Sequence, residues 1–277
     1  MATVWIKKAK VQELSTHIRQ IIDGQNIDLR DNKEGEWSAL KNDIHTLASL
    51  KNERVAALKT ERDTMSQTLA NISHQLKTPL TAMMLMTELL ENAPPERQQE
   101  FIANIKTGVL RMEWLASTLL KMAKLDAGVV DFAKAPVPAE TLVAQALMHL
   151  QVLLDAKEQT VDIHCPTSIV CDRHWTIEAI TNVIKNASEH SPQGGKIYVE
   201  SGSNPICHWL LVRDSGQGIQ RDKIPHLFKR FESSDTQQGH GIGLALSLAI
   251  LRGQGGDILV DGGGSQGVGA TFILKWF

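Results

Sequence analysis

Asn71-Ile-Ser-His-Gln-Leu-Lys-Thr-Pro-Leu80 places one histidine, His74, inside a long helix whose apolar residues repeat in heptads. The apolar residues alternate in steps of three and four, with two steps joined through Arg62, at Val55, Leu58, Met65, Leu69, Ile72 and Leu76. This pattern is typical of the a/d seam of a coiled coil or helical bundle. On this register His74 lies at position f and points into solvent. An ordinary surface histidine is the usual explanation of such a position, so the rest of the chain has to decide.

Four separated motifs follow between residues 172 and 272. The first is a helix that Asp172 can cap, with Asn182 and Asn186 a turn apart on one face. The next two are the strand and glycine turn Leu210-Leu-Val-Arg-Asp-Ser-Gly-Gln-Gly-Ile219 and the segment Leu227-Phe-Lys-Arg-Phe231. The last, Gly239-His-Gly-Ile-Gly-Leu244, is a glycine loop that opens a helix. Each motif alone is weak, but chance does not plausibly produce the ordered set.

Together with the stretch around His74, these motifs resemble the sensor histidine kinases of two-component systems, over about residues 50–277. The stretch around His74 is similar to their H box, and Asn182 with Asn186 to their N box. The G1, F and G2 boxes of the family are matched in order by Asp214–Ile219, Phe228/Phe231 and Gly239–Leu244. The segment Gly267-Val-Gly-Ala-Thr-Phe272 is similar to the closing glycine-threonine element of the family.

The resemblance implies ATP and Mg²⁺ as cofactors. A carboxylate at Asp214 can accept the exocyclic N–H of adenine, and glycines beside it let the backbone approach the base. The N-box asparagine, Asn186 here, is the implied Mg²⁺ ligand, and oxygen ligation suits that ion. Glycine amides at a helix N-terminus suit phosphates. The expected nucleotide-binding residues are Asn182, Asn186, His190, Asp214, Gly216, Gly218, Ile219, Phe231, Gly239, Gly241, Gly243, Leu244 and Thr271.

The resemblance also implies autophosphorylation on His74 and transfer of the phosphoryl group to an aspartate of a response regulator receiver domain. Catalytic roles are expected for His74, for its neighbour Gln75 and for Thr78, which in related kinases supports dephosphorylation of the partner. Pro79 removes an N–H from the helix and invites a bend just past the nucleophile.

Three positions depart from the pattern of the family. Gln75 stands where Glu or Asp usually follows the histidine, and an amide cannot accept the proton. Glu232 and Ser233 replace the usual Tyr-Arg, for which Lys229 or Arg230 is a candidate substitute, and Glu189 replaces a frequently basic residue. A catalytically weak scaffold or phosphatase of the same fold is therefore the alternative function. An ATPase of the gyrase or mismatch-repair kind would need a far longer lid.

The pattern predicts a helical, HAMP-like signal-relay segment at 1–50, a phosphoacceptor hairpin at 51–127, a linker at 128–138 and an ATP-binding domain at 139–277. The hairpin consists of a helix from about Lys51 to Glu91 and a second helix to about Asp126. Its apolar face cannot be buried alone, so two hairpins are expected to pair as a homodimeric four-helix bundle. The last segment is expected to be an α/β sandwich of the GHKL type, with helices on one face of a sheet. Its expected helices are 139–156, 173–189 and 242–252, and its strands 160–164, 168–171, 196–201, 207–213, 257–261 and 270–275.

Composition narrows the function further. The 277 residues carry 29 basic and 31 acidic side chains, so no electrostatic basis for binding nucleic acid exists. Cys165, Cys171 and Cys207 lack the spacing of a zinc site and are expected to be reduced thiols. No apolar run reaches about 18 residues, the length that spans a bilayer. We expect the soluble portion of a longer protein, anchored at the cytoplasmic face of the cell membrane; a natively soluble kinase is the alternative.

Overall fold

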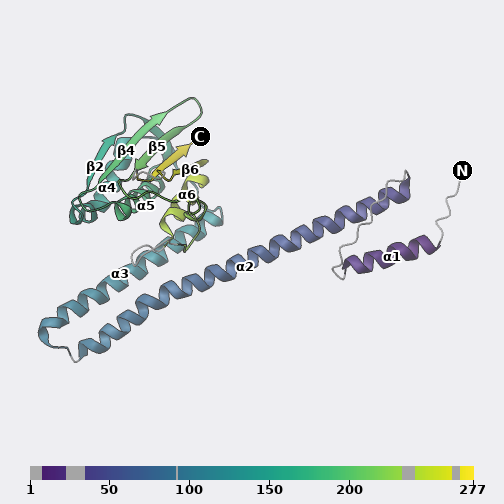
Figure 1. The fold of residues 1–277 in the computed structure, drawn as a ribbon, viewed down its shortest axis with the longest axis horizontal. Coiled ribbons are helices and arrows are strands. Elements are labelled where there is room, and N and C mark those ends of the chain that lie inside the picture. Colours follow the sequence, from purple (N-terminus) through teal and green to yellow (C-terminus); the bar gives the residue numbers. More distant parts are fainter. Residues whose placement is uncertain (1–7, 23–34, 92, 233–240, 264–268) are drawn as a thin grey trace. The chain divides into compact units, whose positions relative to one another are not determined.

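The computed structural model describes residues 8–22, 35–91, 93–232, 241–263 and 269–277 (Figure 1). Contacts divide the chain into two units, Met1–Ala70 and Asn71–Phe277. The first unit contains α1 (Lys8–Ile22) and the first part of α2 (Glu36–Glu91). The rest of α2 and all later elements belong to the second unit, which holds all of the expected nucleotide-binding residues. No helix within the described ranges combines the length and the hydropathy that crossing a membrane requires.

Helix α2 begins at Glu36, so the expected start at Lys51 was wrong. Between Leu47 and Val55 the heptad seam is interrupted by a four-residue stutter, and the helix absorbs it without a break. The helix ends at Glu91 and α3 (Pro95–Asp126) follows, with a proline in its first turn. Proline suits this position because it has no N–H to leave unpaired there. The helical hairpin and its boundaries at the turn are as predicted.

Much of the apolar seam of the hairpin is open to solvent. In the second unit, exposures of 45% to 57% are found at Leu80, Met84, Leu85, Leu89, Ile102, Val109 and Leu110. The two helices approach closely where Gly108 faces Met83, since a Cβ on that glycine would lie 2.6 Å from Met83 Cγ.

The α/β domain begins earlier than expected. Residues Lys134–Pro138, predicted to be the end of a linker, form strand β1, which pairs antiparallel with β3 (Ser168–Asp172). In the described part of the chain a second, five-stranded sheet has the order β2-β4-β5-β7-β6. Its pairs are antiparallel except for the parallel pair β2–β4. Its strands are β2 (Thr160–His164), β4 (Lys196–Ser203), β5 (His208–Arg213), β6 (Gly256–Asp261) and β7 (Thr271–Trp276).

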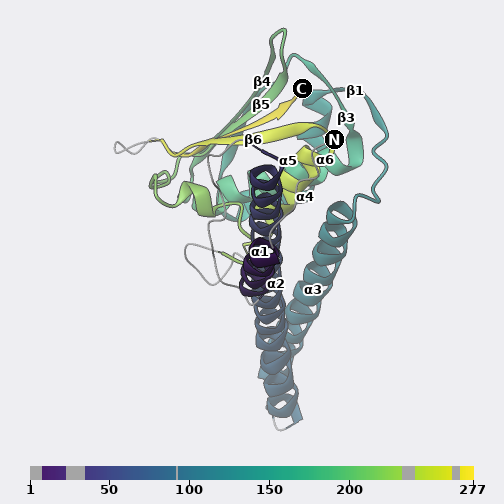
Figure 2. The ribbon, with the colours of Figure 1, turned by 90° about the vertical axis from the view of Figure 1, so that its right-hand side faces the viewer.

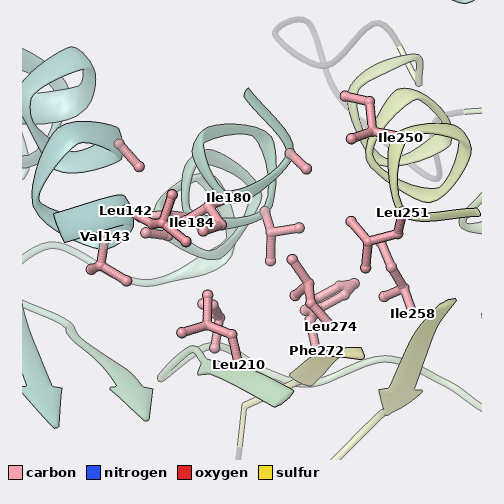
Figure 3. Close-up of a cluster of buried hydrophobic side chains, with 14 of the residues drawn as sticks. Leu142, Val143, Ile180, Ile184, Leu210, Ile250, Leu251, Ile258, Phe272 and Leu274 are labelled. Carbon is pink, nitrogen blue, oxygen red and sulfur yellow. The ribbon is translucent and has the colours of Figure 1, made fainter. Parts of the chain in front are cut away.

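Helices cover one face of this sheet, as predicted (Figure 2). They are α4 (Ala139–Ala156), α5 (Arg173–His190) and α6 (Gly243–Gly253), and a short 3-10 helix, η1 (Ile224–His226), precedes the F-box phenylalanines. Alternate residues of the strands point toward the helices, as the strand period of two requires. The core between the two layers is fully buried and includes Leu142, Ile180, Ile184, Leu210, Leu251, Phe272 and Leu274 (Figure 3).

The end of α3 belongs to the same core. Leu115 and Met122 are 1% and 3% exposed and contact the buried cluster of the α/β domain. An ion pair joins Lys121 Nζ to Glu178 Oε1 at 2.9 Å, between α3 and α5. The part of α3 from Leu115 onward is therefore packed on the helix layer of the α/β domain.

Candidate functional site

Helix α5 carries both N-box asparagines. Asp172 caps the helix, because its Oδ1 accepts a hydrogen bond of 3.1 Å from the N–H of Trp175. The apolar face of α5 is buried, which leaves Asn182 and Asn186 half-buried at its edge. Asn182 Nδ2 is buried and has no hydrogen-bond partner among the residues that the structure describes. An unpaired buried amide is unfavourable, so this group suits a bound polar ligand.

The G1 turn follows strand β5. Asp214 is 4% exposed, and its Oδ1 accepts hydrogen bonds from the N–H of Gly216 at 2.8 Å and of Ala270 at 3.1 Å. Both donors bind Oδ1, so Oδ2 is the oxygen that remains for a ligand. Gly216 has to be glycine, since a Cβ there would lie 2.4 Å from the backbone oxygen of His190. The G1 turn and the end of α5 are therefore in direct contact.

The electrostatics of Asp214 follow from this burial. Burial raises the pKa of the Asp214 carboxyl above its ordinary value, while the two backbone hydrogen bonds and the nearby His190 lower that pKa in part. The carboxylate is thus partly stabilised and partly desolvated, a condition common at functional sites.

Helix α6 begins beside the asparagines. A Cβ on Gly243 would lie 3.4 Å from Asn182 Oδ1, which brings the N-terminus of α6 against the N box. Leu244 is half-buried in the first turn of α6. Among the described residues, no side chain caps this helix, so its first N–H groups are available to an anion.

Backbone hydrogen bonds hold the F-box, G1 and G2 segments in place around the site. Phe231 has a φ of 64°, and its N–H donates to the carbonyl of Gly241 at 2.9 Å. Gly241 has a φ of 61°, a conformation that favours glycine. Ile219 N–H donates to the carbonyl of Gly262 at 2.8 Å. The preceding residue, Gly218, has a φ of 76°. Gly239 lies outside the described residues.

The two remaining expected nucleotide-binding residues are His190 and Thr271. His190 is exposed at the end of α5. Thr271 begins β7 on the face opposite Phe272, and its Oγ1 accepts a 3.3 Å hydrogen bond from Arg213 Nε. Sequence reasoning missed Ala270, the neighbour of Thr271, whose N–H fixes Asp214. A main-chain donor leaves no side-chain signature in the sequence. The sequence signal nearest to it is Gly269, which has no Cβ and so can approach Asp214 closely.

The H box lies on the exposed side of α2. His74 is exposed, and Thr78 Oγ1 donates to the His74 carbonyl at 3.1 Å. Gln75 is half-buried, and Leu76 packs against the core cluster. Pro79 is buried and has no N–H, so the carbonyl of Gln75 lacks its normal helical donor.

The basic residues of the F box are engaged in ion pairs. Glu232 Oε2 lies 2.7 Å from His226 Nδ1, and Glu232 Oε1 lies 3.4 Å from Lys229 Nζ. The hydrogen bond with His226 lowers the pKa of the Glu232 carboxyl. Arg230 Nη2 lies 2.7 Å from Asp126 Oδ1 at the end of α3. Both candidate substitutes for the missing arginine are thus bound to carboxylates in this structure.

Comparison with known proteins gives matches to two families. Residues 64–128 match the His Kinase A (phospho-acceptor) domain, and residues 171–277 match the histidine kinase-, DNA gyrase B-, and HSP90-like ATPase. Sensor histidine kinase WalK of Bacillus subtilis is 26% identical over 240 residues, which cover 78% of this chain and 38% of WalK. The chain spans 25% to 52% of the length of five curated relatives that it matches.

Solved structures share the fold. Full-length ShkA, in complex with AMPPNP, superposes with a TM-score of 0.57 at 25% identity and covers 76% of this chain and 45% of ShkA. Histidine kinase ThkA, in complex with response regulator protein TrrA, gives 0.64 at 17% identity and covers 82% of this chain and 65% of the ThkA chain. With the helical hairpin, the ordered motifs and both family matches in place, the chain belongs to the sensor histidine kinases of two-component systems.

Proposed function

We propose that this chain binds ATP in its α/β domain, transfers the γ-phosphoryl group to His74 and then passes it to an aspartate of a response regulator. The observation that carries the proposal is the combination of a fixed Asp214 carboxylate with the unpaired Asn182 amide at the N-terminus of α6. A carboxylate suits the amino group of adenine, and a helix N-terminus suits phosphates. Both lie in the domain that matches the ATPase family.

The residues present fit a nucleotide with a divalent cation. Asn182 and Asn186 offer amide oxygens at the phosphate end, where Mg²⁺ takes oxygen ligands. When bound, Mg²⁺ neutralises the charge that develops on the phosphates. Asp214 holds the base, the first N–H groups of α6 hold phosphate oxygens, and Asn186 is the proposed metal ligand.

His74 is the proposed nucleophile. A nitrogen of its neutral imidazole attacks the γ-phosphorus, an N–P bond forms, and the bond from the γ-phosphorus to the oxygen of the leaving ADP breaks. The exposure of His74 leaves it open to an incoming nucleotide domain and then to a receiver domain. Thr78 bonds the backbone of His74 through its hydroxyl, which helps to fix the conformation of the turn that carries the nucleophile.

We infer that the active form is a homodimer, because the exposed seam of the hairpin needs a second apolar surface. A receiver domain as partner is supported by the fold shared with ThkA, which was solved with its response regulator. The curated relatives are much longer than this chain. We propose that the whole protein acts at the cytoplasmic face of the membrane and is held there by a segment outside this chain.

A catalytically weak scaffold, or a phosphatase of the same fold, is the second candidate. It is favoured by Gln75, which cannot take a proton, and by the carboxylate partners of Lys229 and Arg230.

Incubation with γ-labelled ATP and Mg²⁺, followed by acid and alkali treatment, separates the two candidates. An autokinase gives a label that is lost in acid and retained in alkali, the behaviour of phosphohistidine. ATP binding without any such label would favour the scaffold or phosphatase, and absence of ATP binding would contradict both.

A further inference from the structure

A buried polar network lies behind the nucleotide site and belongs to none of the motifs. Gln159, in the turn between α4 and β2, is 8% exposed. Its Nε2 lies 3.0, 3.2 and 3.1 Å from the carbonyl oxygens of Ser188, Ser191 and Pro192. Its Oε1 accepts a 2.6 Å hydrogen bond from the Ser188 hydroxyl. One side chain thus binds the last turn of α5 and the residues that follow it.

A second residue of the same turn reaches the same carbonyls. Lys157 Nζ donates to the carbonyl oxygens of Ser188 at 2.7 Å and of Glu189 at 3.1 Å. The last carbonyls of a helix have no partner within the helix, so these donors satisfy groups that burial would otherwise leave unpaired. The backbone adds two ties, from Gly194 N–H to the Lys157 carbonyl and from Thr160 N–H to the Gly195 carbonyl.

The network continues into the G1 turn. Ser191 Oγ accepts a 3.3 Å hydrogen bond from the N–H of Ser215 and lies 3.4 Å from its hydroxyl oxygen. Ser215 directly follows Asp214, and its Oγ also accepts from the N–H of Lys196 at 3.0 Å. Hydrogen bonds therefore run from Gln159 through Ser191 to the residue beside the proposed adenine ligand.

These contacts affect the distance between Asn186 and Asp214. Asn186 stands one turn before the clamped end of α5, and Asp214 stands at the far end of the network. The G1 turn already touches the His190 carbonyl at Gly216, with no room for even a methyl group. A shift of the end of α5 would move the phosphate end of the site against its adenine end.

We propose that Gln159 is a positioning residue of the nucleotide site, which sets the distance between Asn186 and Asp214 through Ser191 and Ser215. The inference rests on the proposed binding of ATP by this domain. Gln159 touches no expected ligand group, so its effect is on affinity for ATP and not on the transfer step itself.

The chain offers a matched control at the other end of α5. Gln254 is 3% exposed, its Oε1 accepts from the Asp172 N–H at 2.6 Å, and its Nε2 donates to Thr176 Oγ1 at 3.3 Å. Gln159→Met and Gln254→Met each remove a buried amide of similar size from a network that contacts α5. Only the first network leads to Asp214.

The test is calorimetric titration of each variant with ATP and Mg²⁺, alongside thermal unfolding and autophosphorylation kinetics. Gln159→Met is expected to raise the Kd and the KM for ATP roughly three- to tenfold, while the rate at saturating ATP stays within about twofold. Gln254→Met is expected to lower the melting temperature with an unchanged Kd. Equal Kd values for Gln159→Met and the parent, or an equal rise in both variants, would overturn the proposal.

A milder pair keeps the test open if Gln159→Met does not fold. Ser191→Ala removes only the hydroxyl that joins α5 to Ser215, and Ser191→Thr restores one. Weaker ATP binding in the alanine variant, recovered in the threonine variant, is expected; parent-like binding by Ser191→Ala would overturn the proposal. A parent that fails to bind ATP would instead refute the proposed function.

Discussion

The helical hairpin and the α/β domain bury their apolar residues in opposite ways. Phe272 and Leu274 are fully buried between the sheet and its helices, with all their partners in the same chain. Val109 on α3 and Met84 on α2 are 52% and 57% exposed on the seam of the hairpin. The α/β domain is thus complete within one chain, whereas the hairpin presents a surface that a second copy can cover.

Helix α3 contains both situations. Its first half carries the exposed Ile102 and Val109, and its last half carries Leu115 and Met122, which are buried against the α/β domain. The same apolar period is therefore buried against the α/β domain at one end of the helix and exposed at the other. Sequence periodicity predicts the stripe but cannot tell which partner covers each part of it.

The sharpest test separates the chemistry of the hairpin from the binding of the α/β domain. His74→Gln is expected to abolish acid-labile labelling and to leave the Kd for ATP unchanged, because His74 belongs to none of the nucleotide motifs. His149→Gln on α4 is the control for loss of an exposed histidine and should label normally. Stable phosphohistidine in His74→Gln would move the nucleophile to another histidine.

Truncation of a side chain in the buried core of the α/β domain is expected to have the largest effect on stability. Phe272→Ala removes a fully buried ring and should lower the free energy of unfolding by about 3–5 kcal/mol. Denaturant unfolding at several protein concentrations measures this. The loss should not depend on protein concentration if the α/β domain is complete in one chain. A loss that depends on concentration would contradict that statement about the α/β domain.

Asp214→Asn tests whether the α/β domain holds the base by charge. Loss of a charge-assisted acceptor should weaken ATP binding by about 1.5–3 kcal/mol in calorimetry.

The pH dependence checks the same group. The pKa of Asp214 is raised, so on acidification its carboxylate is protonated at a higher pH than that of a solvated aspartate. Below that pKa the charged acceptor is lost, so ATP affinity of the parent should fall, and the difference from Asp214→Asn should shrink. A difference that stays constant as the pH falls would argue against the role of Asp214.

The open seam is tested by charge. Val109→Asp should weaken dimerisation tenfold or more, which corresponds to about 1.4 kcal/mol, since a carboxylate would be buried between two hairpins. Sedimentation over a concentration series measures the dissociation constant. Lys106→Asp alters charge at an exposed polar position of the same helix and should leave the dimer nearly intact. Equal weakening by both variants would remove Val109 from the interface.

The last prediction concerns Gln75. A carboxylate at this position could accept a proton during attack, so Gln75→Glu should accelerate autophosphorylation. General bases contribute about 10²–10⁴-fold in other enzymes. We expect a gain near or below the lower limit, because groups other than a carboxylate at position 75 can also accept the proton. Single-turnover rates decide. A rate equal to that of the parent would mean that the amide of Gln75 orients the imidazole without carrying charge.

Much of the α/β domain could be predicted from the sequence. Strand β2 and helix α4 lie at the expected residues, and the other predicted elements agree within two residues at each end. These elements have strong periods and are bounded by glycine or proline. Strand β1 was missed because Pro136 and Pro138 argue against a strand. Both are tolerated because, among the described strands, β1 pairs only with β3 and needs few ladder donors.

The start of α2 and the interior of the site could not be predicted for other reasons. A four-residue stutter resembles a break when only the heptad register is followed, although the backbone continues. The bonds that fix Asp214 come from main-chain N–H groups, and those of Gln159 go mainly to main-chain carbonyls distant in the sequence. Such contacts leave no motif, so the expected ligands are recognisable while the groups that hold them are not.

Phe231 carries a consequence for how this sequence can vary. Its ring packs against the core, but its backbone has a φ of 64°, a left-handed conformation that costs a non-glycine residue roughly 1–2 kcal/mol. Replacement by glycine would relieve the backbone and remove the ring, whereas replacement by another large apolar residue would keep the strain. No single substitution at this position therefore relieves the backbone strain and also keeps the packing of the ring. A stabilised design would have to rebuild the neighbouring backbone as well.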